Sequence, residues 1–469
     1  MKGLCIIGGL GVLAMLAEIF KFKRWLYAIV LIGVLGAYVA NFIEWNQLTD
    51  GHALSFLDKV FVKFSNMIRF DGVALAFSGV IIITAFFWFI MANDYFNSET
   101  SQADHFSLVL FALTGALMLT AFTNMTTLFL GIEILSIPMY VLAASKKGDV
   151  KSNEAGFKYL IMGSLASAFL LLGIALIYGA TGSFDLMQIR SAISGGEMPV
   201  FFYAGVLLML VAMLFKVSAA PFHFWAPDVY EGSPTVITAL MSTIVKTAAF
   251  AAFMRLFLYS FGNISETWGM VMAIVIALSL FISNITAASQ TSVKRMLAYS
   301  SISHAAFMLM AILANAPGLT SVKVILYYSL AYSIGSIGGF TVLYQVSKNG
   351  GETFDAFNGL AKRNPMMALG MLIAMLSLAG IPVTAGFFAK YYVFTALIGT
   401  SYKWLLIIAV LTSCVGVYYY FKVIIAMYFK KPETEEPLQF ELTHALLLGI
   451  TTLVTLALGL MPDLILKML

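Results

Sequence analysis

The chain has 469 residues, of which 61% are hydrophobic and 11% are charged, and its mean hydropathy is +0.93. This composition excludes a soluble domain of the same size, and the net charge of +4 is too small and too dispersed to indicate a nucleic-acid partner. Neither a dinucleotide-binding nor a P-loop motif is present, and Cys5 and Cys414 lie in apolar segments. We therefore expect no nucleotide, no disulfide, no metal and no other cofactor in this chain.

Apolar runs of about 20 residues, the length needed to cross a bilayer, recur along the whole chain. They predict an all-α integral membrane protein with about fourteen transmembrane helices, organised as a single polytopic membrane domain over residues 1–469. The first run is interpreted as a retained span, because its basic cluster follows the apolar stretch. The predicted spans are 3–20, 25–43, 70–91, 105–122, 124–144, 157–179, 200–220, 234–259, 267–287, 294–313, 318–345, 365–398, 403–429 and 442–461.

Two of these spans are interrupted by proline. The seventh is expected to break at Pro221, just after Lys216, and the twelfth at Pro382, just before Lys390. Inside a membrane such breaks are tolerated only where they are buried in protein or line a wet cavity. Because the two breaks lie an odd number of spans apart, the units around them would have inverted orientations, as in transporters built from inverted repeats.

The distribution of basic residues predicts the orientation in the membrane. They follow the odd-numbered spans, so the loops after spans one, five, nine, eleven and thirteen are expected in the cytoplasm and both termini outside. The basic residues are Lys21, Lys23, Arg24, Lys146, Lys147, Lys151, Lys294, Arg295, Lys348, Lys362, Arg363, Lys430 and Lys431.

Three charged residues in the first half are candidates for proton transfer. Glu133 lies near the centre of the fifth span, Lys216 near the end of the seventh, and Lys246 in the middle of the eighth. A charge at that depth costs about 2.5–3.5 kcal/mol or more, and usually marks an ion or proton path. A carboxylate that approaches or leaves a buried lysine changes how readily the lysine holds its proton. The alternatives are a structural ion pair for Glu133 and a Lys216 side chain that reaches the interface.

Two further candidates lie in the second half. His304 is in the tenth span, where an imidazole could relay protons, or could be a buried neutral histidine bonded to a serine or a carbonyl. Lys390 follows the Pro382 break and is expected at depth toward the outside, with an interfacial lysine as the alternative.

Three residues are weaker candidates. Lys294 opens the tenth span, either at a proton entrance or as a topological anchor. Lys158 faces Glu154 four residues earlier in the sixth span, and a surface ion pair is the preferred interpretation. His223 lies in the seventh-span break, where it could line the mouth of the path or belong to an interfacial aromatic belt.

Five stretches together carry a family resemblance. F-K-V-S-A-A-P-F-H-F-W-A-P-D-V-Y-E-G-S-P-T resembles the seventh-span motif of the antiporter-like subunits of respiratory complex I, and its P-D-V-Y-E-G-S-P ending resembles the branch called subunit N. The other four are F-L-G-I-E-I-L-S-I-P-M-Y, E-A-G-F-K-Y-L-I-M-G-S-L-A-S-A, Q-T-S-V-K-R-M-L-A-Y-S-S-I-S-H-A and A-G-I-P-V-T-A-G-F-F-A-K-Y-Y.

The resemblance implies fourteen helices with two inverted five-helix repeats, residues 105–259 (helices 4–8) and 267–429 (helices 9–13). It implies one proton channel in which Glu133, Lys216, Lys246, His304 and Lys390 match the family's functional positions. It also implies partners: the other membrane subunits of complex I, including a paralogous antiporter-like subunit and small subunits, within the lipid of a bacterial inner membrane.

The resulting hypothesis is a proton-translocating subunit of an NADH–quinone oxidoreductase, an enzyme as part of that complex. The flavin, iron–sulfur clusters and quinone would belong to partner subunits. One alternative is a subunit of a multisubunit cation/proton antiporter, which sodium exchange without redox subunits would favour. The other is a purely structural subunit, in which neutralised buried charges would leave pumping intact.

Overall fold

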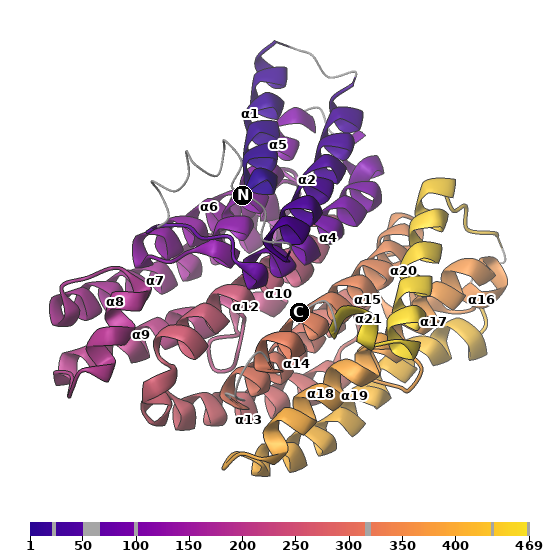
Figure 1. Ribbon diagram of the computed structural model, residues 1–469. Coiled ribbons are helices and arrows are strands. Elements are labelled where there is room, and N and C mark those ends of the chain that lie inside the picture. The colour runs from indigo at the N-terminus through magenta and orange to yellow at the C-terminus, as the bar shows by residue number, and fades with distance from the viewer. Residues whose placement is uncertain (21–24, 50–65, 98–101, 315–319, 433–435, 467–469) are drawn as a thin grey trace. The chain divides into compact units, whose positions relative to one another are not determined.

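The computed structural model describes residues 1–20, 25–49, 66–97, 102–314, 320–432 and 436–466 (Figure 1). These residues are predominantly α-helical and contain no β-strand. Twelve of their helices are long and apolar enough to cross a membrane, and α9, α17 and α18 are shorter apolar helices. Helices satisfy all their backbone groups internally, which hydrocarbon requires. The predicted all-α integral membrane architecture is confirmed.

The chain forms two compact units, each described here separately. Unit 1 comprises Met1–Val217 and Ile244–Val271. Its helices are α1 (Lys2–Ile19), α2 (Leu26–Thr49), α4 (Gly72–Asn97), α5 (Gln102–Ala121), α6 (Met125–Ala143), α7 (Val150–Thr181), α8 (Leu186–Ser194), α9 (Val200–Lys216) and α12 (Lys246–Met254), followed by η3 (Arg255–Ser260) and η4 (Gly262–Ile264).

Unit 2 comprises Ser218–Thr243 and Met272–Leu469. Two elements, η2 (Met241–Val245) and α13 (Ser265–Ser289), run from one unit into the other. The remaining elements are α10 (Trp225–Gly232), α11 (Thr235–Leu240), α14 (Val293–Ala314), α15 (Thr320–Gly350), η5 (Phe354–Phe357), α16 (Leu360–Arg363), α17 (Pro365–Ala379), α18 (Ala385–Ile398), α19 (Trp404–Phe429), α20 (Leu442–Leu460) and α21 (Asp463–Leu466).

Both predicted helix breaks are present. The seventh span ends as α9 at Lys216 and resumes as α10 at Trp225; between them the amide of Ala220 donates to Ser279 Oγ at 2.8 Å. The twelfth span ends as α17 at Ala379, where Gly380 adopts a left-handed conformation with φ of 84°, and resumes as α18 at Ala385. Only glycine adopts that conformation without strain, so Gly380 sets the end of α17.

Glycines allow α7 and α9 to approach closely within unit 1. A Cβ atom on Gly173 would lie 2.8 Å from the carbonyl oxygen of Gly205, and one on Gly205 would lie 2.9 Å from that of Gly173. Any larger side chain at either position would clash with the backbone of the other helix. Small residues of this kind are the usual means by which membrane helices pack without a hydrophobic driving force between them.

Several short helices lie outside the predicted spans, and the longest of them is in unit 1. Residues 186–194 form α8, a short amphipathic helix in which Leu186, Ile189 and Ile193 are buried while Met187 and Arg190 are exposed. Its N-cap Asp185 accepts from the amides of Met187 and Gln188, as capping carboxylates do. Other differences are shifts of boundaries: α7 begins at Val150 rather than residue 157, and α15 extends to Gly350.

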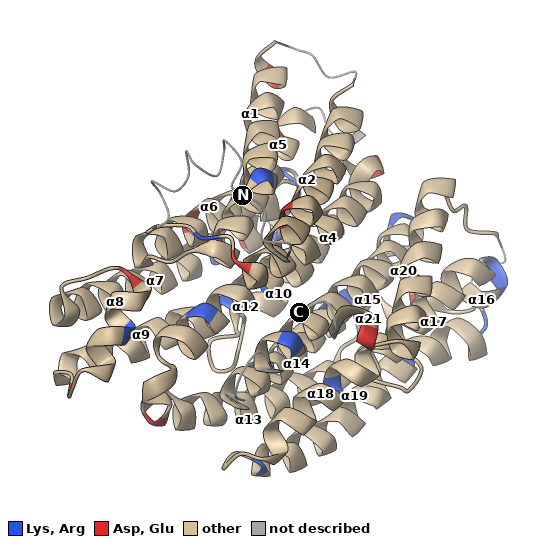
Figure 2. Cartoon of the chain, in the orientation of Figure 1, with Lys and Arg blue, Asp and Glu red and all other residues tan. Residues whose placement is uncertain are grey.

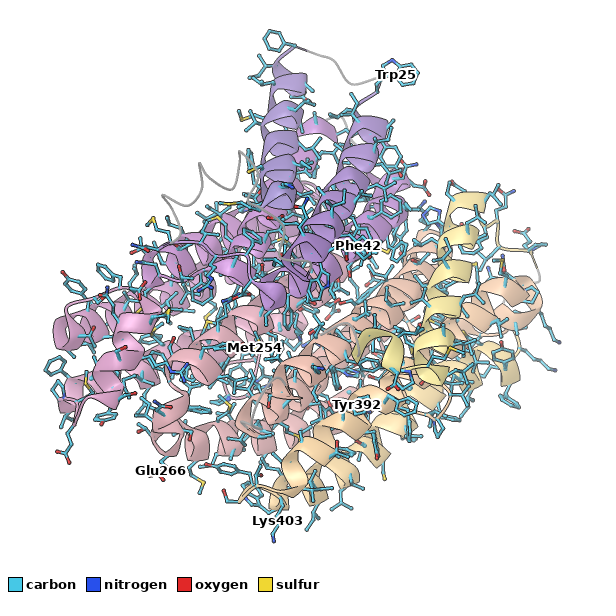
Figure 3. The ribbon with its side chains drawn as sticks, in the orientation of Figure 1. Trp25, Phe42, Met254, Glu266, Tyr392 and Lys403 are labelled. Atoms are coloured by element: carbon cyan, nitrogen blue, oxygen red, sulfur yellow. The ribbon has the colours of Figure 1, made fainter. Side chains whose placement is uncertain are left out.

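Charge and side-chain exposure follow the pattern of a protein surrounded by lipid. Figure 2 shows long tan helices with few charged positions. Apolar side chains project outward from α2, where Phe42 is 46% exposed, and from the neighbouring Trp25, which is 57% exposed, whereas Met254 of α12 is fully buried (Figure 3). Exposed apolar side chains are stable only in contact with lipid or protein partners.

The Gly386→Ala substitution in α18 is expected to destabilise unit 2. Its Cβ would meet the carbonyl oxygen of Ser377 well inside van der Waals contact, which forces the two halves of the broken span apart. Overpacking of this kind costs about 1–3 kcal/mol, measurable as a lower thermal unfolding temperature of the purified chain in detergent. The control is Gly449→Ala in α20, whose Cβ has nothing within 4 Å. Equal temperatures for the two variants would contradict the packing at the break.

Candidate functional site

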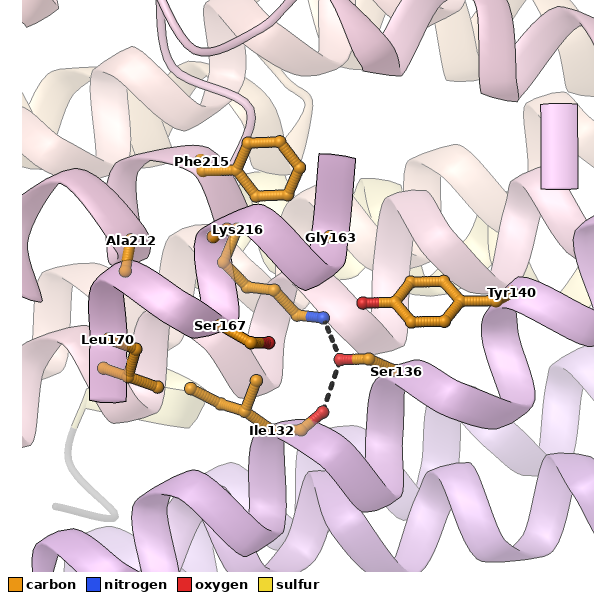
Figure 4. A pocket seen from close by; sticks show the side chains of 10 residues that line it. Ile132, Ser136, Tyr140, Gly163, Ser167, Leu170, Ala212, Phe215 and Lys216 are labelled. Atoms are coloured by element: carbon orange, nitrogen blue, oxygen red, sulfur yellow. Dashed lines mark hydrogen bonds between the residues drawn. The ribbon is translucent and has the colours of Figure 1, made fainter. Parts of the chain in front are cut away.

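In unit 1, Lys216 meets the hydroxyl-bearing face of α6. The lysine is in the last turn of α9 and is 9% exposed, and its Nζ donates to Ser136 Oγ at 2.6 Å. Ser136 in turn donates to the carbonyl of Ile132. The Lys216 side chain therefore points into the unit rather than toward the membrane interface (Figure 4).

Glu133 lies on the same face of α6 but is held by a different helix. Its Oε1 accepts a short hydrogen bond from Ser167 Oγ of α7, and the residue is half-buried. Among the described residues no ion pair directly joins Glu133 to Lys216. Each charged group is instead hydrogen-bonded to a serine hydroxyl: the Glu133 carboxylate accepts from Ser167, and the Lys216 ammonium donates to Ser136.

A cavity of about 20 Å³ lies at this point, which is large enough for one water molecule. Tyr140 directs its hydroxyl toward the Lys216 amine across it (Figure 4). Gly163 makes room for that hydroxyl, since a Cβ there would overlap the tyrosine oxygen. The lining residues are Ile132, Ser136, Tyr140, Gly163, Ala166, Ser167, Leu170, Ala212, Phe215 and Lys216.

Lys246 is also in unit 1, at the start of α12, and is only 2% exposed. Every residue of α12 is buried, and the helix packs against α4, α5 and α9. The preceding turn, η2, is π-helical, a local widening that is frequent at functional sites. The lysine is thus held inside protein, as expected for an ionisable group at depth.

In unit 2, both ring nitrogens of His304 meet tyrosine hydroxyls. Nδ1 lies 2.7 Å from Tyr328 Oη and Nε2 lies 3.1 Å from Tyr420 Oη; which nitrogen donates depends on the tautomer. Tyr420 is also hydrogen-bonded to Ser300 Oγ. Because a hydroxyl both donates and accepts, this arrangement can satisfy either tautomer of the imidazole.

Lys390 lies in α18, in the second turn after the twelfth-span break. It is 8% exposed, and its Nζ donates to the carbonyl of Ala379, the last residue of α17, at 2.8 Å. The ammonium is 5.1 Å from the centre of the Phe307 ring, a cation–π distance. Phe307 is three residues after His304 on α14. Lys390 of α18 therefore contacts α14 about one helical turn from His304.

Lys294 and Arg295 form a cluster of charges that joins α14 to α10 and to the segment that follows α15. Lys294 is 3% exposed; its Nζ bonds to Glu352 Oε1 at 2.9 Å and to the carbonyls of Glu231 and Ser233. Arg295 pairs with Glu231 and, at 3.1 Å, with Asp228. Lys294 is therefore more than a surface anchor.

The other two weak candidates differ from each other. Lys158 pairs with Glu154 at 2.7 Å, as the spacing predicted, and the side chains are 40% and 56% exposed, which agrees with the surface ion-pair interpretation. His223 is buried, and its Nδ1 has no hydrogen-bond partner among the described residues. Trp225 is 4% exposed, whereas Phe224 of the same segment is 70% exposed, so the interfacial-belt alternative stays open.

Sequence reasoning missed the groups that hold the charged residues. Ser136 and Tyr140 follow Glu133 by three and seven residues, so helical periodicity places all three on one face and could have identified them. Ser167, Tyr328, Tyr420 and Glu352 carry no such local signal, because each contacts a residue remote in sequence.

Buried lysines beside broken apolar helices are typical of ion-transporting membrane proteins. The transmembrane family model of NADH:quinone oxidoreductases and Mrp antiporters matches residues 122–416. The NADH-quinone oxidoreductase subunit N proteins of Flavobacterium johnsoniae and Cytophaga hutchinsonii are each 42% identical to the chain; the first alignment covers 100% of both sequences, and the second covers 100% of this chain and 99% of the relative.

Solved structures agree with this match. A chain of respiratory complex I from Thermus thermophilus is 30% identical, with a TM-score of 0.82 over 99% of this chain and 98% of that one. A chain of the Mrp complex from Dietzia, 20% identical with a TM-score of 0.85 over 99% and 96%, shares the fold. The chain belongs to the family of membrane subunits shared by NADH:quinone oxidoreductases and Mrp antiporters.

The Glu352→Gln substitution is expected to destabilise the charge cluster of unit 2. It removes the carboxylate that faces the buried Lys294 ammonium and also accepts from Thr235 Oγ1 at 3.0 Å. Removing the carboxylate partner of a buried ammonium costs about 1–3 kcal/mol when the carboxylate is partly exposed, as Glu352 is. Thermal unfolding of the purified chain measures it, with Glu266→Gln, an exposed carboxylate of α13, as the matched control. A Glu352 variant as stable as the control would show that Lys294 does not depend on this pair.

Proposed function

We propose that the chain acts as the subunit N type of membrane-arm subunit in an NADH–quinone oxidoreductase. In this role it moves protons from the cytoplasm to the outside, driven by quinone reduction in other subunits. The observation that carries the proposal is the burial of Lys216, Lys246, His304 and Lys390 in a chain that aligns over its whole length with subunit N proteins.

The first half of the proposed route uses the groups of unit 1. Protons enter from the cytoplasm and reach Lys216, and Glu133 controls their transfer by moving toward or away from the lysine. A carboxylate close to a buried ammonium stabilises the charged form, and its withdrawal favours release. Ser167 supplies a resting partner for the withdrawn carboxylate, and Ser136 and the small cavity supply an oxygen and room for a water beside the ammonium.

The second half uses the groups of unit 2. A proton passing Lys246 reaches His304, whose contacts with Tyr328 and Tyr420 leave it able to accept on one nitrogen and donate from the other. Lys390 is the terminal group and releases the proton outward. Its bond to the Ala379 carbonyl and its contact with the Phe307 ring hold the ammonium in place.

The energy and the redox groups come from elsewhere in the complex. One charge crossing against 100 mV requires about 2.3 kcal/mol, which in this proposal comes from the partner subunits. We assign the flavin, iron–sulfur clusters and quinone to those partners, which include a paralogous antiporter-like subunit and small membrane subunits. Lys158 and Lys294 have supporting structural roles in this scheme.

The same proposal includes the internal symmetry and the topology. Residues 105–259 and 267–429 are the two repeats, inverted relative to each other, and both termini lie outside the cytoplasm. The basic loops after odd-numbered spans support this orientation. The rival function, a subunit of a cation/proton antiporter, is less well supported, because the antiporter structure shares only the fold while the full-length relatives are subunit N proteins.

The Lys246→Ala substitution is expected to lower the number of protons pumped per electron. It removes the only amine in α12, which is wholly buried. The measurement is proton uptake into vesicles containing the assembled complex, normalised to NADH oxidation, with Lys403→Ala as the control because that lysine is exposed. An unchanged ratio would remove Lys246 from the route. Sodium exchange in vesicles that contain the chain without redox subunits would favour the antiporter instead.

The Ser136→Ala substitution is expected to slow pumping while leaving assembly intact. The change removes the oxygen that accepts from Lys216 Nζ, and losing a hydrogen bond to a charged group costs about 1.5–3 kcal/mol, or roughly 10- to 150-fold in an equilibrium that depends on it. Ser164→Ala on the exposed face of α7 is the matched control. Equal pumping rates for both serine variants would mean that Ser136 plays no part in holding the proton at Lys216.

A further inference from the structure

Unit 1 contains a second polar cavity, much larger than the one at Lys216. Its volume is about 650 Å³, within the range of small-molecule sites. It lies where α5 and η3 end and where α4, α6 and α8 begin, away from the proposed proton-transfer groups. We call it the arginine pocket; its lining residues are Arg69, Asp71, Phe122, Thr123, Leu186, Met187, Arg190, Ser191, Ser194, Gly195, Arg255, Tyr259 and Ser260.

The arginine pocket carries an excess of positive charge. Three guanidinium groups line it against one carboxylate. The carboxylate is already engaged, because Asp71 pairs with Arg255 at 2.6 Å and accepts from the amide of Ala74 at 2.8 Å at the start of α4. Arg69 and Arg190 are exposed and have no ion-pair partner in the described part of the chain. Two guanidinium groups are thus available to an anion.

Arg255 is the fixed member of the three. It is 7% exposed, and in addition to its pair with Asp71 its Nε donates to the carbonyl of Thr120 at the end of α5. These bonds lock its planar group in place at the wall of the arginine pocket. A rigid guanidinium loses little entropy when it binds a planar or tetrahedral oxyanion, which is why arginine is the usual phosphate ligand.

A second observation also indicates a missing ligand. Ser260 lines the arginine pocket and is 1% exposed, yet its hydroxyl has no hydrogen-bond partner among the described residues. Buried hydroxyls are almost always satisfied. An oxyanion bound beside Arg255 would accept this hydrogen bond and remove the deficit.

The setting of the pocket indicates the kind of anion. One wall is α8, whose amphipathic pattern is that of a helix lying in the membrane interface. Phe122, Leu186 and Met187 add apolar surface next to the charges. With the orientation proposed above, this end faces outside, where the positive-inside rule gives no reason for three arginines to gather.

We propose that the arginine pocket binds the phosphate of an anionic phospholipid headgroup. Arg69, Arg190 and Arg255 hold the phosphate oxygens, Ser260 donates its hydroxyl, and the acyl chains follow the apolar side of α8. The lipid would fasten α8 to the ends of α4 and α5. This inference rests on the family fold, on the cavity and on the proposed orientation, not on the proton route, so pumping by the complex does not decide it.

The test uses the purified complex, depleted of lipid and titrated with phosphatidylglycerol, with bound lipid counted by native mass spectrometry. The double variant Arg69→Gln, Arg190→Gln is expected to bind at least tenfold more weakly, and Ser260→Ala several-fold more weakly. Lys403→Gln, an exposed cation before α19, is the control and should bind normally. Phosphatidylcholine, which has no net charge, should bind far more weakly than phosphatidylglycerol.

Three results would overturn the proposal. The first is unchanged phosphatidylglycerol binding by both pocket variants. The second is displacement of the lipid by an equal concentration of inorganic phosphate, which would identify a free anion as the ligand. The third is lipid binding that appears only when neighbouring subunits are removed, which would show that a protein partner fills the arginine pocket. None of these measurements depends on proton pumping, so the two proposals fail separately.

Discussion

The structure depends on the hydrogen bonds that satisfy backbone groups where a membrane helix ends inside the protein. A helix that ends at depth leaves carbonyls without partners, and its C-terminal end carries partial negative charge. In unit 2 the ammonium of Lys390 meets this need by bonding to Ala379, and in unit 1 Lys216 occupies the last turn of α9. The broken helix and the buried lysine therefore stabilise each other, since each supplies what the other lacks in a low-dielectric environment.

The local geometry of the second break shows how closely the two are fitted. A Cβ on Gly380 would lie 2.8 Å from Lys390 Cδ, and the residue needs a positive φ as well. The same glycine thus ends α17 and admits the lysine. Any side chain there would both strain the backbone and displace the ammonium, so the break and the ionisable group form one structural element.

Three of the groups in the proposed proton route are held by hydroxyls. Ser136 and Ser167 hold Lys216 and Glu133 in unit 1, while Tyr328 and Tyr420 hold His304 in unit 2. Hydroxyls donate and accept, so they tolerate a change in protonation that a direct ion pair would resist. Direct ion pairs are found instead at Lys158–Glu154 and Arg255–Asp71 in unit 1, and at Lys294–Glu352 in unit 2.

The sequence predicted the membrane architecture and both breaks, because apolar run length and intramembrane proline have direct physical meaning in hydrocarbon. It did not predict α8, since nine residues with one buried position in every three or four fall below the length that a membrane span requires. It also did not predict that Glu352 faces Lys294, or that two tyrosines hold His304, because those contacts join segments far apart in the chain. The roles of the ionisable groups and the repeat boundaries stay predictions.

The contact between Gly173 and Gly205 limits what can move near Lys216. Because the two backbones are already in contact, α7 cannot slide along α9 without a steric clash. The helical positions that carry Ser167 and Lys216 are therefore fixed relative to each other. Glu133 lies on α6, so its distance to Lys216 can still change, either by rotation about side-chain bonds, which takes picoseconds to nanoseconds, or by displacement of α6, which takes microseconds to milliseconds. In the proposed proton route, a side-chain rotation of Glu133 between Ser167 and Lys216 would be far faster than a helix displacement, so the rate of gating would show which of the two motions controls it.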